Sequence, residues 1–412
     1  MPSRRRRRRA GPPHVAFIIE TSMAYGREIL HGTVQYVREN GPWTVFFEPR
    51  SMQDPAPPWL EDWDGDGIIT TLYPQFSELI RRTGIPTIDL DDQEPRSGLP
   101  TVRSDQLAIG AMAAAHLIER GFTRFGFFGY PQFEWSRLRL EAFRRAVAAA
   151  GFSCEEYEPA HAVSWGHQMP AWEAEIDRVA RWIDGLPKPM GLMACNDFRG
   201  VQALDACRRA DVAVPEEVAV IGVDDEILAC ELAQPSLSSI IPDCRRIGYE
   251  AARLLDGVLA GGAPPPRSLL VPPLGISVRQ SSDVTAIPDP IVADAMRFIR
   301  EHACRGIRLD DVVRHAGISR SSLHRRFRAS TGRTIHDAIA GMRMDRVKRL
   351  LVETELPLHA VAERVGFAHV EYLVAAFRKA FGATPGAYRK AHRPEPSRHA
   401  PARPRAGGRA AD

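Results

Sequence analysis

The last hundred residues of the chain contain the same helical pattern twice. Residues 309–316 and 358–365 each place apolar side chains at positions i, i+3, i+4 and i+7, which puts one apolar stripe on one face of a short helix. A glycine follows each stripe, Gly317 and Gly366, where a tight turn favours a residue that can take positive φ. A second helix is predicted after each turn. Two such helix-turn-helix units in tandem predict an all-helical module that binds double-stranded DNA.

The charge of the chain is divided unevenly along its length. Residues 286–393 hold 20 Lys and Arg against 11 Asp and Glu, whereas residues 14–285 hold 24 against 38. A basic segment joined to an acidic one indicates that only the basic segment meets a polyanion. The formal net charge of +3 for the whole chain conceals this division.

The acidic segment alternates short, fully apolar runs with longer amphipathic stretches. Six runs are predicted as buried strands: HVAFIIE, DGIIT, PTIDL, RFGFFGY, GLMACND and VAVIGVDD. Helices are predicted between them, for example over 26–39, 106–120 and 138–150. Repeated strand–helix–strand order indicates parallel sheets flanked by helices, and nearly 270 residues of it indicate two lobes. We therefore expect a two-lobed α/β domain followed by an all-helical domain.

The expected domain boundaries follow from composition. Residues 1–13 form a basic tail with six consecutive arginines, 14–285 the α/β domain, 286–393 the helical domain, and 394–412 a tail rich in Pro, Arg and Ala. No apolar run is long enough to span a bilayer, and no secretion signal follows the arginines, so we expect a cytoplasmic protein. The six cysteines have no zinc spacing, so we expect core thiols and neither metal nor cofactor.

The helical domain resembles the DNA-binding domains of the arabinose-operon-regulator (AraC) family. The residues that carry this resemblance are GISRSSLHRRF, the linking stretch 334–351, the Gly-Phe pair at 366–367, and Gly-x-Thr-Pro-x-x-Tyr-Arg at 382–389. This pattern is long, and it is more specific than a single helix-turn-helix. The resemblance implies a transcription regulator that contacts DNA with both units.

The α/β domain resembles the sugar-binding core of the lactose/galactose-repressor (LacI/GalR) family, which is similar to periplasmic sugar-binding proteins. SRLRLEAF at 136–143, CNDFRGVQAL at 195–204, PEEVAVIGVDD at 215–225 and PSLSSI at 235–240 carry the likeness. The order of the two domains is similar to that of the xylose-responsive activators of bacteria. The resemblance implies a small-sugar effector, D-xylose or a related pentose, and activation of transcription with RNA polymerase as a partner. The residues alone fix neither the sugar nor the operator.

The DNA contacts are expected on the second helix of each unit. In the first unit Ser319 is predicted to cap the helix, while Leu323 and Phe327 face the core. The candidate DNA-binding residues there are Arg320, Ser321, His324, Arg325 and Arg328. In the second unit Ala368 stands where the family usually has a capping Ser or Asp, and the candidates are His369, Glu371, Arg378 and Lys379. We expect the first unit to discriminate bases and the second to position the protein on the backbone.

Polar residues recur where the predicted strands end, and ligands of open α/β sheets bind at the carboxyl ends of strands. By the repressor-family resemblance, Arg139, Asn196 and Asp224 are candidates for sugar hydroxyls. Asp197 is a candidate for contact with the ligand or for capping the next helix. Trp165 is the candidate aromatic plate for the sugar ring. Glu20, Ser22 and Tyr25 are expected to close the site from the other lobe.

The expected mechanism is a hinge: sugar binds between the lobes, favours the closed form, and changes how paired subunits present their DNA-binding domains. The homodimer rests on analogy. Two alternatives stay open at this stage. One is a regulator whose α/β domain is amidase-like, which needs a nucleophilic cysteine, although Cys195 lacks flanking glycines. The other is a transport-type sugar receptor, which the missing secretion signal and the basic C-terminal domain oppose.

Overall fold

The computed structural model describes residues 11–51, 54–71, 74–90, 98–159, 169–262, 267–283, 286–287, 289–354 and 356–392. It divides into two compact units, Met1–Pro288 and Asp289–Asp412. The division falls three residues beyond the predicted boundary, because Ala286 packs into the core of the first unit and its N–H donates to the carbonyl of Arg120 (2.8 Å). The expected fold class is confirmed: two parallel α/β sheets precede an all-helical unit.

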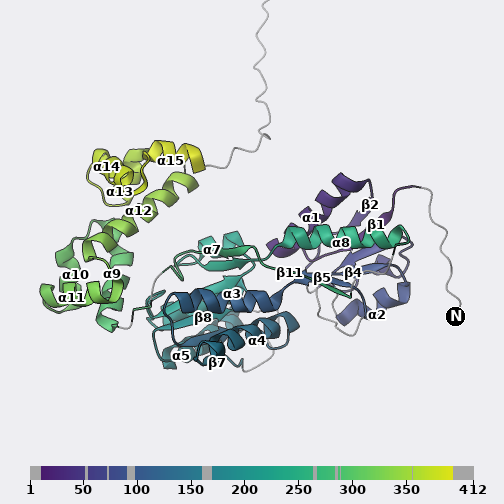
Figure 1. Cartoon of the computed structure of the whole chain (residues 1–412), viewed down its shortest axis with the longest axis horizontal. Helices are drawn as coiled ribbons and strands as arrows, with labels where there is room; N and C mark the ends of the chain where they lie inside the picture. Colours follow the sequence, from purple (N-terminus) through teal and green to yellow (C-terminus); the bar gives the residue numbers. More distant parts are fainter. Residues whose placement is uncertain are drawn as a thin grey trace, which may run out of the picture. The chain divides into compact units, whose positions relative to one another are not determined.

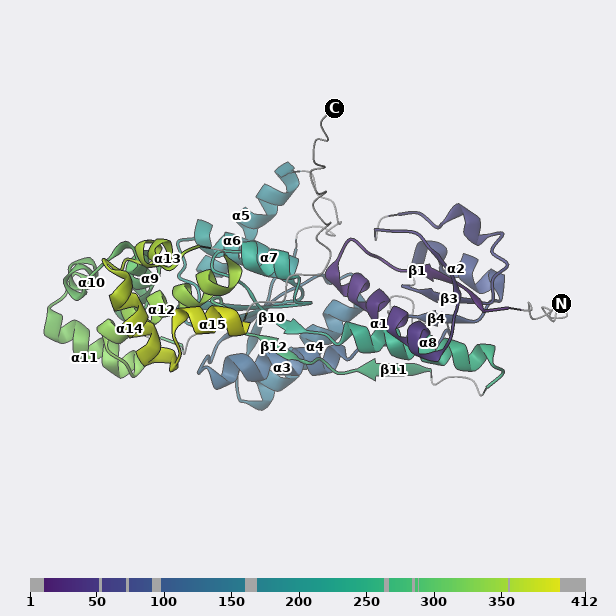
Figure 2. The same cartoon turned by 90° about the horizontal axis from the view of Figure 1, so that it is seen from above.

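The first unit is built on two six-stranded sheets (Figures 1 and 2). The first sheet has the order β11-β5-β4-β3-β1-β2 and is parallel throughout. Its strands are β1 (His14–Ile18), β2 (Thr44–Phe47), β3 (Gly67–Thr70), β4 (Thr87–Asp89), β5 (Thr101–Ser104) and β11 (Ser268–Val271). The second sheet has the order β12-β10-β9-β8-β6-β7, and only β12 runs antiparallel. Its strands are β6 (Phe125–Phe128), β7 (Cys154–Glu156), β8 (Met190–Ala194), β9 (Val218–Val223), β10 (Ser238–Ile241) and β12 (Gly275–Ser277).

Helices cover both faces of each sheet. In the first lobe, α1 (Ala24–Asn40) and α8 (Cys244–Leu259) pack on one face, and η1 (Pro58–Leu60) with α2 (Pro74–Thr83) on the other. In the second lobe, α3 (Gln106–Glu119) and α4 (Glu134–Ala149) pack on one face, and α5 (Met169–Gly185) with α6 (Asp197–Arg209) on the other. The short helix α7 (Ile227–Leu232) follows β9.

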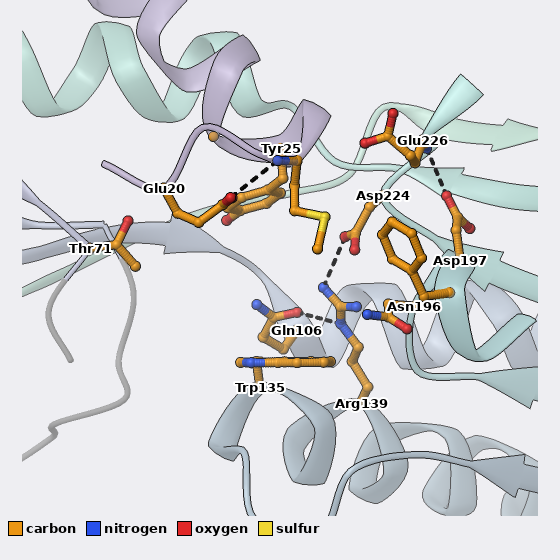
Figure 3. A pocket seen from close by; sticks show the side chains of 13 residues that line it. Glu20, Tyr25, Thr71, Gln106, Trp135, Arg139, Asn196, Asp197, Asp224 and Glu226 are labelled. Carbon is orange, nitrogen blue, oxygen red and sulfur yellow. Dashed lines mark hydrogen bonds and ion pairs between the residues drawn. The ribbon is translucent and has the colours of Figure 1, made fainter. Parts of the chain in front are cut away.

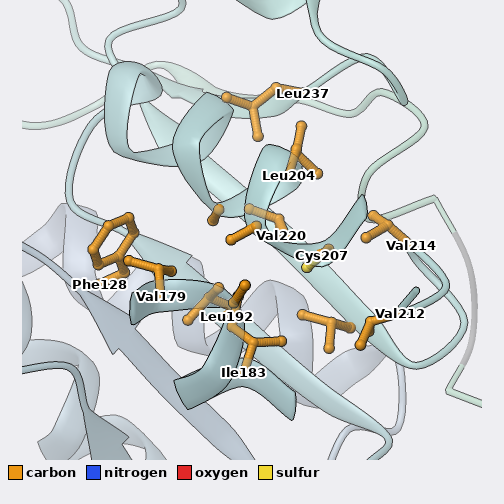
Figure 4. Packing of buried hydrophobic residues seen from close by; sticks show 14 of the residues in the cluster. Phe128, Val179, Ile183, Leu192, Leu204, Cys207, Val212, Val214, Val220 and Leu237 are labelled. Carbon is orange, nitrogen blue, oxygen red and sulfur yellow. The ribbon is translucent and has the colours of Figure 1, made fainter. Parts of the chain in front are cut away.

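Strand β9 shows why these strands are apolar at every position. Val218 and Val220 pack toward α5 and α6, whereas Ala219, Ile221 and Val223 pack toward α3 and α4. All five side chains are fully buried. Burying one Val or Ile side chain is worth about 1.5–3 kcal/mol, so a strand covered on both faces has no position for a polar residue. Figure 4 shows the first of these two clusters, in which Val220 and Leu192 lie among helical side chains.

The chain crosses between the two sheets three times: from β5 to α3, from β10 to α8, and from β11 to β12. Each lobe is therefore assembled from separate stretches of sequence. The three crossings leave the carboxyl ends of β1 and β3 in one lobe, and of β8 and β9 in the other, available to a common site.

The second unit consists of helices, with two helix-turn-helix units joined by a long helix. Its elements are α9 (Pro290–His302), η3 (Ala303–Arg305), α10 (Leu309–Ala316), α11 (Arg320–Thr331), α12 (Ile335–Glu353), α13 (Leu358–Arg364), α14 (Val370–Phe381) and α15 (Pro385–His392). The two turn glycines take positive φ as predicted, 66° at Gly317 and 74° at Gly366. In the parts of the chain described here, none of the helices combines the length and the apolarity that crossing a bilayer requires.

Candidate functional site

A pocket lies at the carboxyl ends of the strands in the first unit and takes residues from both lobes (Figure 3). From the first lobe it is lined by Glu20, Met23, Tyr25, Gly26 and Thr71. From the second lobe it is lined by Gln106, Trp135, Arg139, Asn196, Asp197, Phe198, Asp224 and Glu226. Six of the eight residues predicted to bind ligand are therefore brought together here. The lining combines carboxylates, amides and one guanidinium with aromatic rings.

Arg139 is a cation held almost fully buried in the pocket. Its residue is only 3 % exposed, so its charge needs partners close by. Its Nε donates to Oε1 of Gln106 at 2.7 Å, and a second nitrogen donates to the carbonyl of Cys195. Its guanidinium lies 5.0 Å from the centre of the Trp135 ring. These contacts fix the plane of the guanidinium before any ligand arrives.

Asp224 completes this cluster from the end of β9. Its Oδ1 lies 3.6 Å from a guanidinium nitrogen of Arg139 (Figure 3). Asp224 also has φ of 105°, and Asp225 has φ of 48°, in a region that residues other than glycine rarely adopt. Such backbone strain persists where the surrounding structure imposes it, and it gathers at functional sites.

Asn196 and Asp197 have different structural roles. The side-chain oxygen of Asn196 caps α6 by accepting from the N–H of Arg199 at 3.0 Å. Asp197 is fully buried, and its carboxylate accepts from the hydroxyl of Ser239 (2.6 Å) and the N–H of Glu226 (2.7 Å). Burial, with the nearby Asp224, raises the pKa of Asp197 well above its usual range. Asp197 thus organises the loop after β9, and the cap that was considered for it belongs to Asn196.

Glu20, Ser22 and Tyr25 form the first-lobe wall of the site. Oε1 of Glu20 accepts from the N–H of Ser22 (2.6 Å), from the Ser22 hydroxyl, and from the N–H of Met23 (3.2 Å). Burial raises the pKa of the Glu20 carboxyl. The Tyr25 hydroxyl lies 3.1 Å from that of Ser104. Glu20 and Tyr25 line the pocket, whereas Ser22 acts on it through Glu20.

The predicted aromatic plate, Trp165, lies outside the described residues. Two aromatic residues that sequence analysis missed line the pocket instead, Trp135 and Phe198. The sequence did contain a signal for Trp135, because it precedes Arg139 by four positions and so shares its helix face. Gln106, Glu226 and Thr71 were also missed. Gln106 comes after β5, which was not among the predicted strands, whereas Thr71 and Glu226 come after the predicted strands β3 and β9 but were not singled out.

Helix α11 presents the DNA-binding candidates of the first unit on its outer face. Arg320, Ser321, Arg325 and Arg328 are exposed and His324 is half-buried, while Leu323 and Phe327 are fully buried. Ser319 caps the helix as predicted, its hydroxyl accepting from the N–H of Ser322 at 3.3 Å. Leu323 and Phe327 turn one face of α11 toward the core, so the exposed arginines lie together on the opposite, basic face.

Helix α14 differs from α11 at its start and on its outer face. It begins one residue later than expected, so the cap position is His369 and not Ala368, and no side chain caps it. The reason is one extra residue between the turn glycine and the first buried leucine, compared with the first unit. A shallow hollow runs along its outer face, lined by Val370, Glu371, Val374, Ala375, Arg378 and Lys379. Three of the four candidates lie there, and exposed His369 lies at the helix start.

The cysteines provide no activated nucleophile. Cys195, the residue considered for an amidase-like site, is fully buried, and burial raises the pKa of its thiol to about 11. A thiol attacks as its thiolate, and such a pKa leaves almost none at neutral pH. All six cysteines are free, and four of them are buried.

Two family models match the chain. A periplasmic binding protein-like domain matches residues 113–282, and a helix-turn-helix domain matches residues 312–391. The xylose operon regulatory protein of Escherichia coli strain K12 is 31 % identical over 91 % of this chain and 96 % of its own length. The corresponding protein of Haemophilus influenzae is 32 % identical over 91 % and 97 %.

Solved structures are similar to the chain in fold as well. The structure of a xylose-binding transcription activator superposes with a TM-score of 0.80 at 30 % identity, covering 93 % of this chain and 100 % of the other. A LacI-type regulator in complex with D-xylulofuranose, from Alkaliphilus metalliredigens, matches 66 % of this chain and 99 % of its own with a TM-score of 0.51 at 20 % identity, which supports the fold alone. Both resemblances drawn from the sequence are confirmed.

Proposed function

Because the chain belongs to the family of bacterial xylose operon regulatory proteins, we propose that D-xylose or a closely related pentose controls its binding to DNA. The chain is a DNA-binding transcription regulator of this type with a sugar-binding sensor, and its relatives are regulators and not enzymes. The identity of the sugar, activation through RNA polymerase, a homodimer and a cytoplasmic location are the proposed refinements.

The observation that supports a sugar is the chemistry gathered around Arg139. A pentose presents several hydroxyls, each able to donate and accept, and one apolar ring face. The Arg139 and Asp224 side chains approach only to 3.6 Å, longer than a hydrogen bond, so a hydroxyl placed beside them can accept from one and donate to the other. Trp135 and Phe198 supply apolar surface for the ring. Asn196 adds its amide nitrogen to the donors.

The proposed mechanism is closure of the two lobes on the sugar. Glu20 and Tyr25 come from one lobe and Arg139, Asn196 and Asp224 from the other, so a bound ligand bonds to both only when the lobes are close. A ligand with different affinities for the open and closed forms shifts their populations, and the same coupling must act in reverse from DNA to sugar. A tenfold gain in DNA affinity requires about 1.4 kcal/mol of coupling.

A thermal-shift series with D-xylose, D-ribose, L-arabinose and D-glucose tests the effector. We expect D-xylose to raise the unfolding temperature of the sensor, since a ligand at about 100 times its Kd stabilises by about 2.7 kcal/mol. Asp224→Asn should remove this shift and keep DNA binding without sugar. Asp225→Asn is the matched control, because Asp225 shares the strained backbone but pairs with Arg279 (2.8 Å) and does not line the pocket. A full D-xylose shift in Asp224→Asn would refute the assignment of this site.

A further inference from the structure

Helix α3 links the effector pocket to the end of the sensor unit. Its first residue, Gln106, lines the pocket and holds Arg139 at 2.7 Å. At its other end, His116 lies 2.7 Å from the Ser282 hydroxyl, and Arg120 donates to the Ser282 carbonyl at 2.8 Å. Fourteen helical residues cover about 21 Å at 1.5 Å per residue. The helix packs in the fully buried core of the second lobe, so its two ends form one rigid element.

The chain leaves the sensor directly from this end of α3. The N–H of Ala286 donates to the carbonyl of Arg120 at 2.8 Å. In the sequence only Ile287 and Pro288 separate Ala286 from Asp289, the first residue of the DNA-binding unit. The covalent path from the anchored residue Ala286 to Asp289 is therefore only two residues long.

Asp289 holds two elements of the DNA-binding unit together. Its Oδ1 caps α9 by accepting from the N–H groups of Ile291 (3.0 Å) and Val292 (3.4 Å). Both carboxylate oxygens also accept from Arg326 of α11, at 2.6 and 2.8 Å. This two-pronged geometry fixes direction as well as distance. Arg326 holds the pKa of the Asp289 carboxyl below its usual range.

Arg326 differs from Arg325 and Arg328 of the same helix. Arg326 is half-buried and its guanidinium bonds to Asp289, whereas the side chains of Arg325 and Arg328 are exposed. It is the arginine of this helix that turns toward α9, and it was not a DNA-binding candidate in the sequence. The basic face of α11 is thereby held at a defined angle to the start of the unit.

We propose that Asp289 and Arg326 are a positioning pair through which the state of the sensor sets the orientation of the first recognition helix. The proposal rests on the proposed function and adds the route by which the effector acts. Neither residue is a DNA contact in it. In this proposal the pair passes the state of the sensor to α11. Asp289 bonds to Arg326 of α11, and only two residues separate it from Ala286, which bonds to the end of α3.

Two conservative substitutions separate this role from simple stability. Asp289→Asn keeps a good helix cap, since Asn and Asp cap equally well, but it loses the charged two-pronged pair. Arg326→Lys keeps the charge and loses the planar fork. Arg297→Lys is the control for an arginine-to-lysine change as such, because Arg297 forms a single ion-pair contact with Asp294 (2.7 Å) within α9 and does not join two elements. Circular dichroism is used to check that each variant stays folded.

The experiment uses the full chain, D-xylose, and a duplex selected from a random pool by the wild-type protein. In the wild-type protein, D-xylose is expected to raise the affinity for DNA. In Asp289→Asn and Arg326→Lys we expect D-xylose to raise this affinity less than twofold, while the affinity for D-xylose itself, measured by calorimetry, stays unchanged. Both should also lower the ratio of affinities for the selected and a scrambled duplex about tenfold, with scrambled-duplex affinity unchanged. Arg297→Lys should match wild type in each measurement.

The two readouts distinguish failure of this proposal from failure of the proposed function. If both variants keep the wild-type D-xylose gain and the wild-type discrimination, the positioning role is refuted. If the wild-type protein does not respond to D-xylose, the proposed effector is wrong. The discrimination ratio, which needs no sugar, then decides the positioning role by itself.

Discussion

The two helix-turn-helix units of the DNA-binding domain share a core and differ on their outer faces. Leu323 and Phe327 of α11 correspond to Leu373 and Phe377 of α14, and all four side chains are fully buried. On the outside, α11 carries arginines behind a serine cap, whereas α14 has no side-chain cap and an outer hollow with Val374 and Ala375 at its centre. The comparison teaches that packing fixes the fold of both units, while the exposed positions are free to differ between them.

The largest expected effect tests the shared core. Phe327→Ala and Phe377→Ala should each destabilise their own unit by about 3–5 kcal/mol, because each removes a fully buried ring. Hydrogen exchange, followed separately in peptides from α10–α11 and from α13–α14, measures the loss of protection. If one substitution leaves its unit fully protected, the two cores are not equivalent and the comparison fails.

The next effect tests the difference between the outer faces. Arg325→Ala should cost about 1–3 kcal/mol on a preferred duplex and much less on a random one, if Arg325 makes a two-pronged contact with a base. Binding is measured by fluorescence anisotropy on both duplexes.

Arg378→Ala is the companion variant on α14. It should weaken binding to both duplexes alike and lower the slope of log affinity against log salt by about one, as expected for one lost phosphate contact. Equal losses on both duplexes for Arg325→Ala would remove it as a base contact. Selective losses for Arg378→Ala would give base recognition to α14.

A smaller effect tests the helix caps. Ser319→Ala should destabilise the start of α11 by about 1 kcal/mol, because the N–H of Ser322 loses its acceptor. His369→Ser should stabilise α14, since the structure shows no side-chain cap at that position. Exchange of the first-turn amides of each helix reports both changes. If the gain in stability at the start of α14 equals the loss at the start of α11, the caps account for the difference in stability between the two helix starts.

The smallest effect is a response to acid. Oδ2 of Asp311 accepts from the N–H of Arg308 at the start of α10 (2.8 Å), and this bond lowers the pKa of Asp311. A carboxyl whose pKa is lower in the folded state than in the unfolded state stabilises the fold at pH values above its unfolded pKa. This stabilisation is lost as the pH falls through the folded pKa. In the second unit Pro357 stands in place of Arg308 at the helix start, and Ala360 stands in place of Asp311, so there is no carboxyl to accept such a bond. An NMR titration should therefore show the Arg308 amide signal moving below pH 4 as this hydrogen bond is lost, and Pro357 has no N–H that could form the same bond.

The strands that were predicted from the sequence are those at the centre of each sheet. β1, β3 and β4 in the first lobe, and β6, β8 and β9 in the second, are covered on both faces and read as continuous apolar runs. The interior strands β5 and β10 were missed, because their sequences TVRS and SSII are partly polar. The edge strands β2, β7, β11 and β12 were missed as well. Their side chains are partly exposed, as in the SLLV of β11, so burial does not impose an apolar pattern on them.

The candidate site could be predicted where the strand ends carry polar residues. Arg139, Asn196 and Asp224 were found and lie in one pocket. Ser22 acts on that pocket through its hydrogen bond to Glu20, and Asp197, which lines the pocket, also bonds to the loop after β9. Spacing alone reveals neither hydrogen bond. Trp135 was missed because an aromatic residue at a helix start is common in ordinary cores. Only the fold shows that this helix begins at the pocket.

The three crossings between the sheets restrict how such a protein can be rearranged by recombination. No single breakpoint within 14–283 separates one complete lobe from the other, because residues after β10 return to the first lobe. A breakpoint between Pro288 and Asp289 leaves both units whole. Exchange of effector specificity between related genes, or in a designed chimera, therefore has to transfer the entire sensor at once and make its join at this junction.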